Sequence, residues 1–219
     1  MISSELRQRV LSLAAAERSP TRSETRRSTW LALVTAMMIS AAIFALAGGI
    51  RPSGRPLELV LATMTQAMVV AAGASWIAVR RGSFTDGRQR DVLAALILLV
   101  PLALVAGKVS LSAAWPGMAE PWPDRIGFRC LGLFLAIGAA PLGVYLWIWR
   151  LRDVRSPGLQ GAALGIAAGA GAWTVLDMWC PVADPVHIAL GHLLPLALLG
   201  TAGILWRRWR VVYRSTERS

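Results

Sequence analysis

Long apolar runs without charge constrain this chain more than any other feature. Six segments approach the roughly 20 apolar residues that a helix needs to cross a bilayer. They are residues 30–50, 57–79, 91–111, 126–149, 159–179 and 186–206. Only helices and closed barrels satisfy all backbone hydrogen bonds inside a membrane, and these runs are too long for barrel strands. We therefore predict an all-α integral membrane protein built as a six-transmembrane-helix bundle.

The composition agrees with a chain that lies mostly in lipid. Hydrophobic residues make up 55% of the sequence and charged residues 16%, whereas soluble domains carry nearer a quarter charged residues. The formal charge of +11 would suit a nucleic-acid-binding surface. The arginines, however, gather beside the apolar runs, where they orient a membrane protein. We therefore expect a lipid bilayer as partner and no direct contact with nucleic acid.

The distribution of arginine predicts the orientation of the bundle. Four segments hold 18 of the 23 basic residues: the N-terminal segment, the loops after the second and fourth runs, and the C-terminal tail. Because cytoplasmic loops are enriched in basic residues, this alternation predicts a bacterial inner-membrane protein with both termini in the cytoplasm. The expected parts are a cytoplasmic amphipathic segment at 1–29, a membrane domain at 30–206 and a basic cytoplasmic tail at 207–219.

A short amphipathic helix is expected near the N-terminus, on a serine- and arginine-rich tether that precedes the first span. Its apolar residues recur at helical spacing, and Pro20 ends the pattern. They are Ile2, Leu6, Val10 and Leu13. An apolar stripe of this kind suits the groove of a partner protein, and it suits the surface of an anionic leaflet equally well.

Glycines recur in the fifth run at every fourth position, at Gly161, Gly165 and Gly169. This spacing gives a smooth helix face that a second helix can approach closely. We favour packing inside the bundle as its role. An interface with a second subunit is the alternative.

Residues with metal-binding and redox chemistry gather at the predicted outer face. Cys130 opens the fourth run and Cys180 closes the fifth, so an antiparallel bundle places both at one membrane depth. Two acidic residues and the only two histidines are close to Cys180 in sequence: Asp177, Asp184, His187 and His192. Thiols and imidazoles bind soft or borderline metals, and two thiols form a disulfide in an oxidising compartment. Buried cysteines also pack simply as small apolar residues, and the spacing selects neither a role nor a metal.

Catalysis and transport find little support in the residues. The sequence contains no pattern typical of a catalytic triad, a phosphate-binding loop or a carboxylate pair, so we expect no enzyme and no cofactor. Ion-coupled transporters need ionisable groups at mid-membrane, whereas Lys108 and Asp177 lie near the outer ends of their spans and are expected to pair. A small multi-pass transporter subunit or a membrane assembly factor is the alternative function.

Several residues resemble a known family. They are Cys130 at the start of the fourth run, Trp179-Cys180-Pro181, and the pattern His187-x-x-x-Gly191-His192-x-x-Pro195. Together with the six spans, they make the chain similar to the NrsF family of negative regulators of extracytoplasmic-function sigma factors. The resemblance implies a membrane anti-sigma factor that holds its sigma factor at the cytoplasmic face and releases it under stress. It also implies that Cys130 and Cys180 sense the stress, and it favours sigma-factor binding over leaflet binding for the N-terminal stripe.

Overall fold

The computed structural model is a bundle of helices. The structure describes residues 22–49, 56–79, 86–114, 127–150, 156–180 and 182–216. Its helices are α2 (Arg22–Leu46), α3 (Leu57–Val79), α4 (Asp86–Ala113), α5 (Phe128–Trp149), α6 (Pro157–Asp177), α7 (Pro185–Ile188) and α8 (Leu194–Thr216), with a π-helical turn, η1 (Ala189–Leu193), between α7 and α8. These described residues form no strand, which agrees with the predicted all-α class.

Five helical stretches are long and apolar enough to cross a membrane. They are Leu57–Ala78, Arg90–Ala113, Phe128–Ile148, Pro157–Asp177 and Pro185–Arg210. The apolar part of α2, Trp30–Leu46, is shorter than these five. Several apolar helices of this length indicate a multi-pass membrane protein.

Both ends of α2 differ from the sequence prediction. The helix begins at Arg22, so part of the predicted tether forms its first turns. It ends at Leu46, short of Ile50, because Gly48 and Gly49 adopt positive φ angles of 107° and 58°. The Gly49 N–H donates to the Phe44 carbonyl at 3.0 Å, which is the hydrogen bond of a glycine C-cap.

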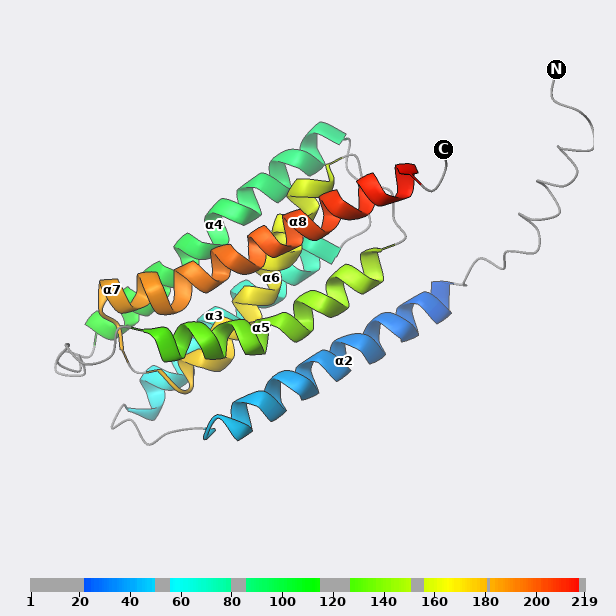
Figure 1. Ribbon diagram of the computed structural model, residues 1–219. Helices are drawn as coiled ribbons and strands as arrows, with labels where there is room; N and C mark the ends of the chain where they lie inside the picture. The colour runs from blue at the N-terminus through cyan, green and yellow to red at the C-terminus, as the bar shows by residue number, and fades with distance from the viewer. Residues whose placement is uncertain are drawn as a thin grey trace, which may run out of the picture.

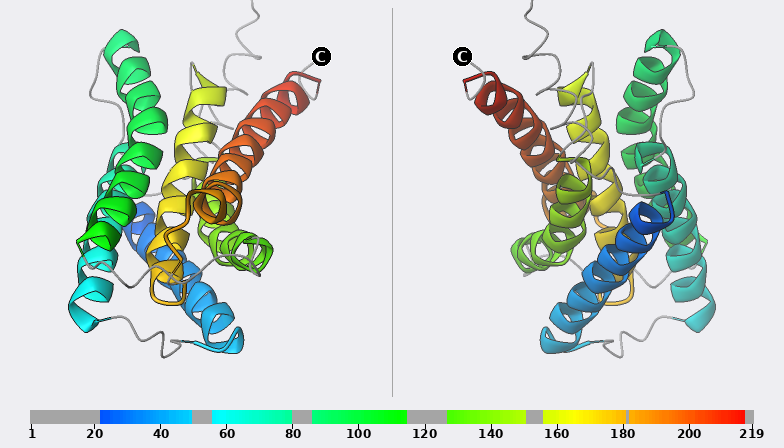
Figure 2. Two further views of the ribbon diagram at one scale, coloured as in Figure 1. Left: turned by 90° about the vertical axis from the view of Figure 1, so that its left-hand side faces the viewer. Right: turned by 90° about the vertical axis from the view of Figure 1, so that its right-hand side faces the viewer.

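The long helices run antiparallel in succession, and α6 lies in the middle of the bundle (Figure 1). Figure 2 shows α6 with α3 and α4 on one side and α5 and α8 on the other, and α6 contacts all four of these helices. Most residues of α6 are buried. Helix α2 lies on the outside against α5. The beginning of α2 and the end of α8 lie at the same end of the bundle.

The glycines of α6 allow its close packing against α8. A Cβ on Gly161 would collide with the Gly203 carbonyl, and a Cβ on Gly165 would collide with the Leu199 carbonyl. A Cβ on Gly169 would collide with the Leu196 side chain. The glycine pattern is therefore explained by packing within one chain, which was the favoured interpretation.

Polar side chains inside the bundle bind backbone carbonyls of neighbouring helices. Gln160 of α6 donates to the Ala78 carbonyl of α3 at 2.5 Å. Ser40 of α2 donates to the Ile137 carbonyl of α5 at 2.9 Å. Such hydrogen bonds stabilise helix pairs where water does not compete, and they connect α6 to α3 and α2 to α5.

Proline has different consequences in three of the helices. Pro101 and Pro141 lie inside α4 and α5. The sixth run was expected to form one α-helix, but it contains the π turn η1 just before Pro195. Proline has no N–H and its ring crowds the carbonyl four residues earlier. The Leu194 N–H instead donates to the Ala189 carbonyl, five residues back, and this widens the helix at that level.

Candidate thiol–imidazole site

Four residues from α5, α7, η1 and the connection after α6 meet at one end of the bundle. They are Cys130, Cys180, His187 and His192, called here the thiol–imidazole cluster. One potential ligand atom from each lies within 4.8 Å of the others, and all four residues are buried. Both cysteines are thiols and not halves of a disulfide. The antiparallel topology predicted a common depth for the cysteines, and the structure brings the two histidines to them as well.

The π turn explains how two histidines five residues apart share one face. In a regular α-helix that spacing would place His187 and His192 about 140° apart around the axis. A π turn pairs residue i with residue i+5, so the two side chains stack along the helix. Their ring centroids lie 5.7 Å apart. The π turn therefore assembles the histidine half of the cluster.

Glycine allows α5 and η1 to approach each other beside the cluster. A Cβ on Gly191 would lie 3.0 Å from Cβ of Cys130 and 3.3 Å from the Gly127 carbonyl oxygen. Gly127 itself has a φ of 84°, a conformation that residues with a side chain rarely adopt. Gly191 therefore sets the distance between the helix that carries Cys130 and the turn that carries His192.

Cys180 interacts with the other three members of the cluster. Its Sγ lies 3.1 Å from Nε2 of His187. Hydrogen bonding with Cys130 holds the pKa of the Cys180 thiol well below its usual range, and contacts with His187 and His192 lower it further against the effect of burial. A thiolate is the form that ligates metals and reacts as a nucleophile, so this position suits either chemistry.

His192 is fully buried, with 0% of its surface exposed. Among the described residues, no group makes a hydrogen bond of ordinary geometry with either of its ring nitrogens, and the group that interacts with the ring is the Cys180 thiol. The Trp173 ring lies 4.8 Å from it, centroid to centroid, and the Phe134 ring lies 6.3 Å away in an edge-on arrangement. An imidazole buried without partners is unfavourable, and this points to a ligand that satisfies it.

Trp173 is a wall of the site that the sequence prediction missed. It is completely buried in α6, whereas tryptophans such as Trp76 and Trp147 are exposed near the ends of α3 and α5. Trp173 lies about one turn before the end of α6 at Asp177, much as Trp76 lies about one turn before the end of α3 at Val79, so its position in the sequence did not distinguish it.

A buried ion pair lies next to the cluster. Lys108 Nζ of α4 lies 2.6 Å from Oδ1 of Asp177 in α6, and the two side chains are 3% and 1% exposed. Lys108 also donates to the Cys180 carbonyl at 3.3 Å. The pairing of Lys108 with Asp177 was predicted and is confirmed. It fixes α4 and α6 to the backbone that carries Cys180.

The two acidic candidates do not join the cluster itself. Asp177 pairs with Lys108. Asp184 caps α7, because its carboxylate accepts hydrogen bonds from the backbone N–H groups of Val186 and His187, a common N-cap arrangement. Asp184 therefore orients the helix that carries His187. The candidate sigma-binding residues lie outside the described residues: Ile2, Leu6, Val10 and Leu13.

The ligand set of the cluster is two sulfurs and two nitrogens, which suits soft or borderline metals such as zinc or monovalent copper. Tetrahedral zinc with ordinary bond lengths needs these ligand atoms roughly 3.3–3.8 Å apart. Cys180 Sγ and His187 Nε2 are already 3.1 Å apart, and atoms as far apart as the 4.8 Å limit of the cluster would have to approach by about 1 Å. A disulfide would need a larger movement, because its two sulfurs lie about 2.05 Å apart.

These features define a class: a multi-pass helical membrane protein with a buried thiol–imidazole cluster at one end of its bundle. The sequence profile described as "NrsF: Negative regulator of sigma F" matches residues 13–212, and the chain belongs to the NrsF family. This agrees with the resemblance found in the sequence. No curated protein and no solved structure matches the chain.

Proposed function

We propose that this protein is a membrane-bound anti-sigma factor. It sequesters an extracytoplasmic-function sigma factor at the cytoplasmic face and releases it when stress acts on the thiol–imidazole cluster at the outer face. The observation that carries this proposal is the match to a family of negative regulators of a sigma factor over residues 13–212. The matched range includes all four cluster residues.

In the proposed topology the chain crosses the inner membrane six times, with both termini in the cytoplasm. The apolar part of α2 is then the first span, and five stretches of spanning length follow. The arginine-rich segments favour this orientation. So does the arrangement of the described helices, because the beginning of α2 and the end of α8 lie at one end of the bundle.

Sequestration would depend on the segment before α2. We propose that the apolar stripe of Ile2, Leu6, Val10 and Leu13 docks in a groove of the sigma factor, as amphipathic helices commonly do. The arginine-rich cytoplasmic loops would add to this surface. Tethering at the membrane then keeps the sigma factor away from RNA polymerase.

Sensing would use the cluster in one of two ways. Metal capture would engage the two thiols and both imidazoles, and it would satisfy the unpartnered nitrogens of His192. Oxidation to a disulfide would join Cys130 to Cys180, with two electrons and two protons passing to an oxidant of the cell envelope. His192 favours metal capture, because a disulfide would leave its imidazole unsatisfied.

Either event would tie α5 to the end of α6. A nearly complete shift from a bound to a released state requires a difference in binding of about 5.5 kcal/mol between the two states. Only the part of the metal-binding or disulfide free energy that differs between the bound and released states contributes to this shift. The total of a structural metal site, about 10–16 kcal/mol, leaves more room for such a difference than the roughly 2–4 kcal/mol of a typical disulfide.

A transporter function has less support from the described residues. Several polar side chains of the bundle are used in internal hydrogen bonds. Thr63 and Thr174 bond to carbonyls of their own helices. Gln66 bonds to the Ala103 carbonyl of α4. A polar path for a substrate needs groups that are available to it, and these are engaged within the protein.

The partner is tested by purifying the intact protein in mild detergent from unstressed cells of its own host. We expect a sigma factor to copurify, and we expect its loss when residues 1–28 are deleted, since those carry the proposed contact. Deletion of residues 217–219 serves as the control that should keep it. Absence of any sigma factor in the unstressed sample would exclude the anti-sigma function.

The sensor is tested separately with the double variant Cys130→Ser, Cys180→Ser. We expect the variant to keep the sigma factor bound and to lose release under metal or oxidant challenge. His192→Ala separates the two chemistries, because it should abolish the response to metal while leaving disulfide formation intact. Normal release by the double serine variant would move the sensing site elsewhere.

A further inference from the structure

A pocket opens at the opposite end of α5 from the thiol–imidazole cluster. It has a volume of about 640 Å³ and lies between α5 and α8. Its lining residues are Gly143, Leu146, Trp147, Arg150, Trp206 and Arg210. Trp147 follows Cys130 by 17 positions, which corresponds to about 26 Å along the helix. The pocket therefore lies near the other membrane interface.

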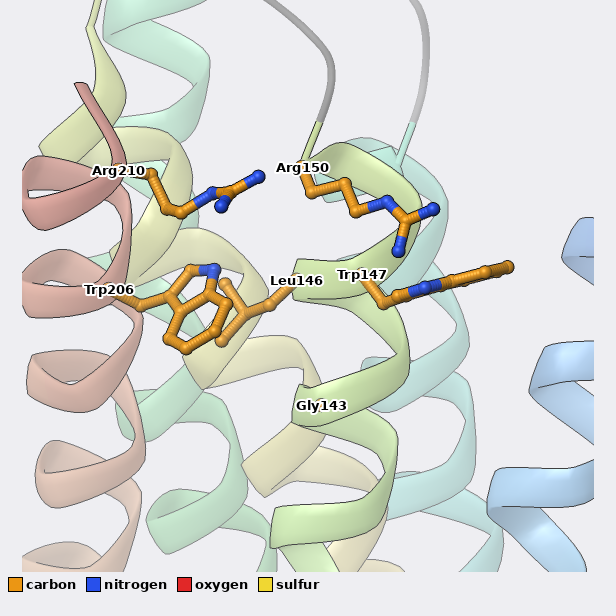
Figure 3. Close-up of a pocket in the computed structure, with 6 residues that line it drawn as sticks. All are labelled: Gly143, Leu146, Trp147, Arg150, Trp206 and Arg210. Carbon is orange, nitrogen blue, oxygen red and sulfur yellow. The ribbon is translucent and has the colours of Figure 1, made fainter. Parts of the chain in front are cut away.

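Two arginines form the outer rim of this pocket. Figure 3 shows Arg210 extending from α8 toward α5 above Trp206, and Arg150 folding over Trp147. The Arg150 guanidinium lies 4.7 Å from the centroid of the Trp147 ring. Nε of Arg210 is buried and has no hydrogen-bond partner in the described part of the chain. None of the described lining residues is acidic, so the rim attracts an anion.

Below the arginines the pocket becomes apolar. Trp206 and Leu146 lie between the two helices in Figure 3. Gly143 lies about one turn of α5 before Trp147. A Cβ on Gly143 would meet no atom within 4 Å, so this glycine leaves an open notch beneath Leu146. A ligand that fits this pocket has an anionic head and an apolar tail.

We propose that the pocket binds one anionic phospholipid, such as phosphatidylglycerol. Its phosphate pairs with Arg150 and Arg210, because guanidinium forms charge-assisted hydrogen bonds with phosphate. One acyl chain lies along Leu146 and the Gly143 notch. Trp147 and Trp206 lie at the level of the head group, where tryptophan is favoured. Basic pockets between membrane helices commonly hold anionic head groups.

An acidic peptide of a partner protein is the competing occupant, and the apolar notch argues against it. A peptide carboxylate would use the two arginines but would leave the space at Gly143 empty. An acyl chain fills that space, and each buried methylene adds to its affinity. The lipid therefore accounts for both halves of the pocket.

The test measures lipid retained by the intact purified protein in native mass spectrometry. Phosphatidylglycerol and phosphatidylethanolamine with identical acyl chains are added separately. We expect tighter binding of phosphatidylglycerol, and a loss of about 30-fold in the double variant Arg150→Gln, Arg210→Gln, the combined effect of two basic residues near an anionic head group. Arg208→Gln, on the same helix but outside the pocket, should bind as the unaltered protein does.

A second variant tests the acyl-chain seat without touching the charges. Gly143→Leu fills the notch and should weaken phosphatidylglycerol binding about tenfold, the equivalent of two buried methylene groups. Gly132→Leu is the control, since a Cβ there also meets no atom within 4 Å but lies near the opposite end of α5. Equal retention of the two lipids, or unchanged binding in both the arginine double variant and Gly143→Leu, would overturn the proposal. Binding of an acidic peptide but not of the lipid would overturn it too.

Discussion

The two ends of the α5–α8 pair are packed differently: the end at the cluster is closely packed and the other end is open. At the cluster end a Cβ added to Gly191 would lie only 3.0 Å from Cβ of Cys130, and the four side chains of the cluster are buried. At the other end the helices diverge (Figure 1), Gly143 faces open space and the arginines line a pocket.

This difference separates residues that the fold requires from residues that a ligand requires. At the closed end, a change of one methyl group or one charge has no room to relax, since protein interiors are close-packed. At the open end, the same change meets lipid or solvent. Equivalent substitutions at the two ends therefore have very different expected costs.

Charge removal should give the largest contrast. Lys108→Met leaves Asp177 buried without its counter-ion, and breaking such a pair costs about 3–5 kcal/mol of stability. Arg208→Met at the open end should change stability by no more than about 0.5 kcal/mol. Thermal unfolding in detergent measures both, and the double variant Lys108→Met, Asp177→Leu should recover most of the loss. Equal costs for the two single variants would contradict the comparison.

Addition of Zn²⁺ should give the next largest change in stability. Zn²⁺ at about 100 times its dissociation constant should stabilise the protein by about 2.7 kcal/mol, visible as a rise in Tm. The rise should vanish in Cys130→Ser, Cys180→Ser. Mg²⁺ serves as the control, because a hard cation prefers oxygen ligands and the cluster offers none. A rise that survives in the serine variant would mean that zinc binds elsewhere.

Overpacking at the closed end should change stability less than either charge removal or zinc binding. Gly191→Leu forces a side chain against Cys130 and the Gly127 carbonyl, and we expect a loss of about 1–3 kcal/mol. The affinity for Zn²⁺ should fall with it, because α5 and η1 must move apart. Unfolding curves and zinc titrations of the same sample test the two effects together. Unchanged values in both would show that the helices are not held at this distance.

The same substitution at the open end should have the smallest effect. Gly143→Leu enters space that no protein atom occupies, so the change in stability should stay within about 0.5 kcal/mol in lipid-free detergent. A loss as large as that of Gly191→Leu would mean that the two ends do not differ in packing.

The sequence predicted the bundle well where hydropathy alone determines it. The second predicted run, 57–79, coincides with α3 (Leu57–Val79), and the fifth, 159–179, is displaced by two residues from α6 (Pro157–Asp177). These boundaries follow from apolar length and the flanking arginines, so no knowledge of packing was needed. The first run was predicted less well, because the paired glycines Gly48 and Gly49 end α2 early.

The site was predicted only in part. The topology placed Cys130 and Cys180 at a common depth. The position of the His192 side chain beside them depends on the π turn, and no periodicity in the sixth run predicted that turn. The roles of Asp184 as a helix cap and of Trp173 as a wall arise from contacts between elements. Such contacts depend on helix rotation, and hydropathy does not determine rotation.

The π turn also bears on how this chain tolerates changes in length. A π turn is equivalent to an α-helix with one residue inserted, so deleting a single residue from 189–193 would restore regular α-helical winding. Five residues of the π turn advance the chain by about as much rotation as four residues of an α-helix, so the helix beyond such a deletion would keep nearly the same orientation about its axis. Trp206 and Arg210 would therefore still face α5. A deletion in the regular part of α8 before Trp206 would instead rotate both by about 100°, so the π turn is the most suitable place in α7–α8 for the loss of one residue.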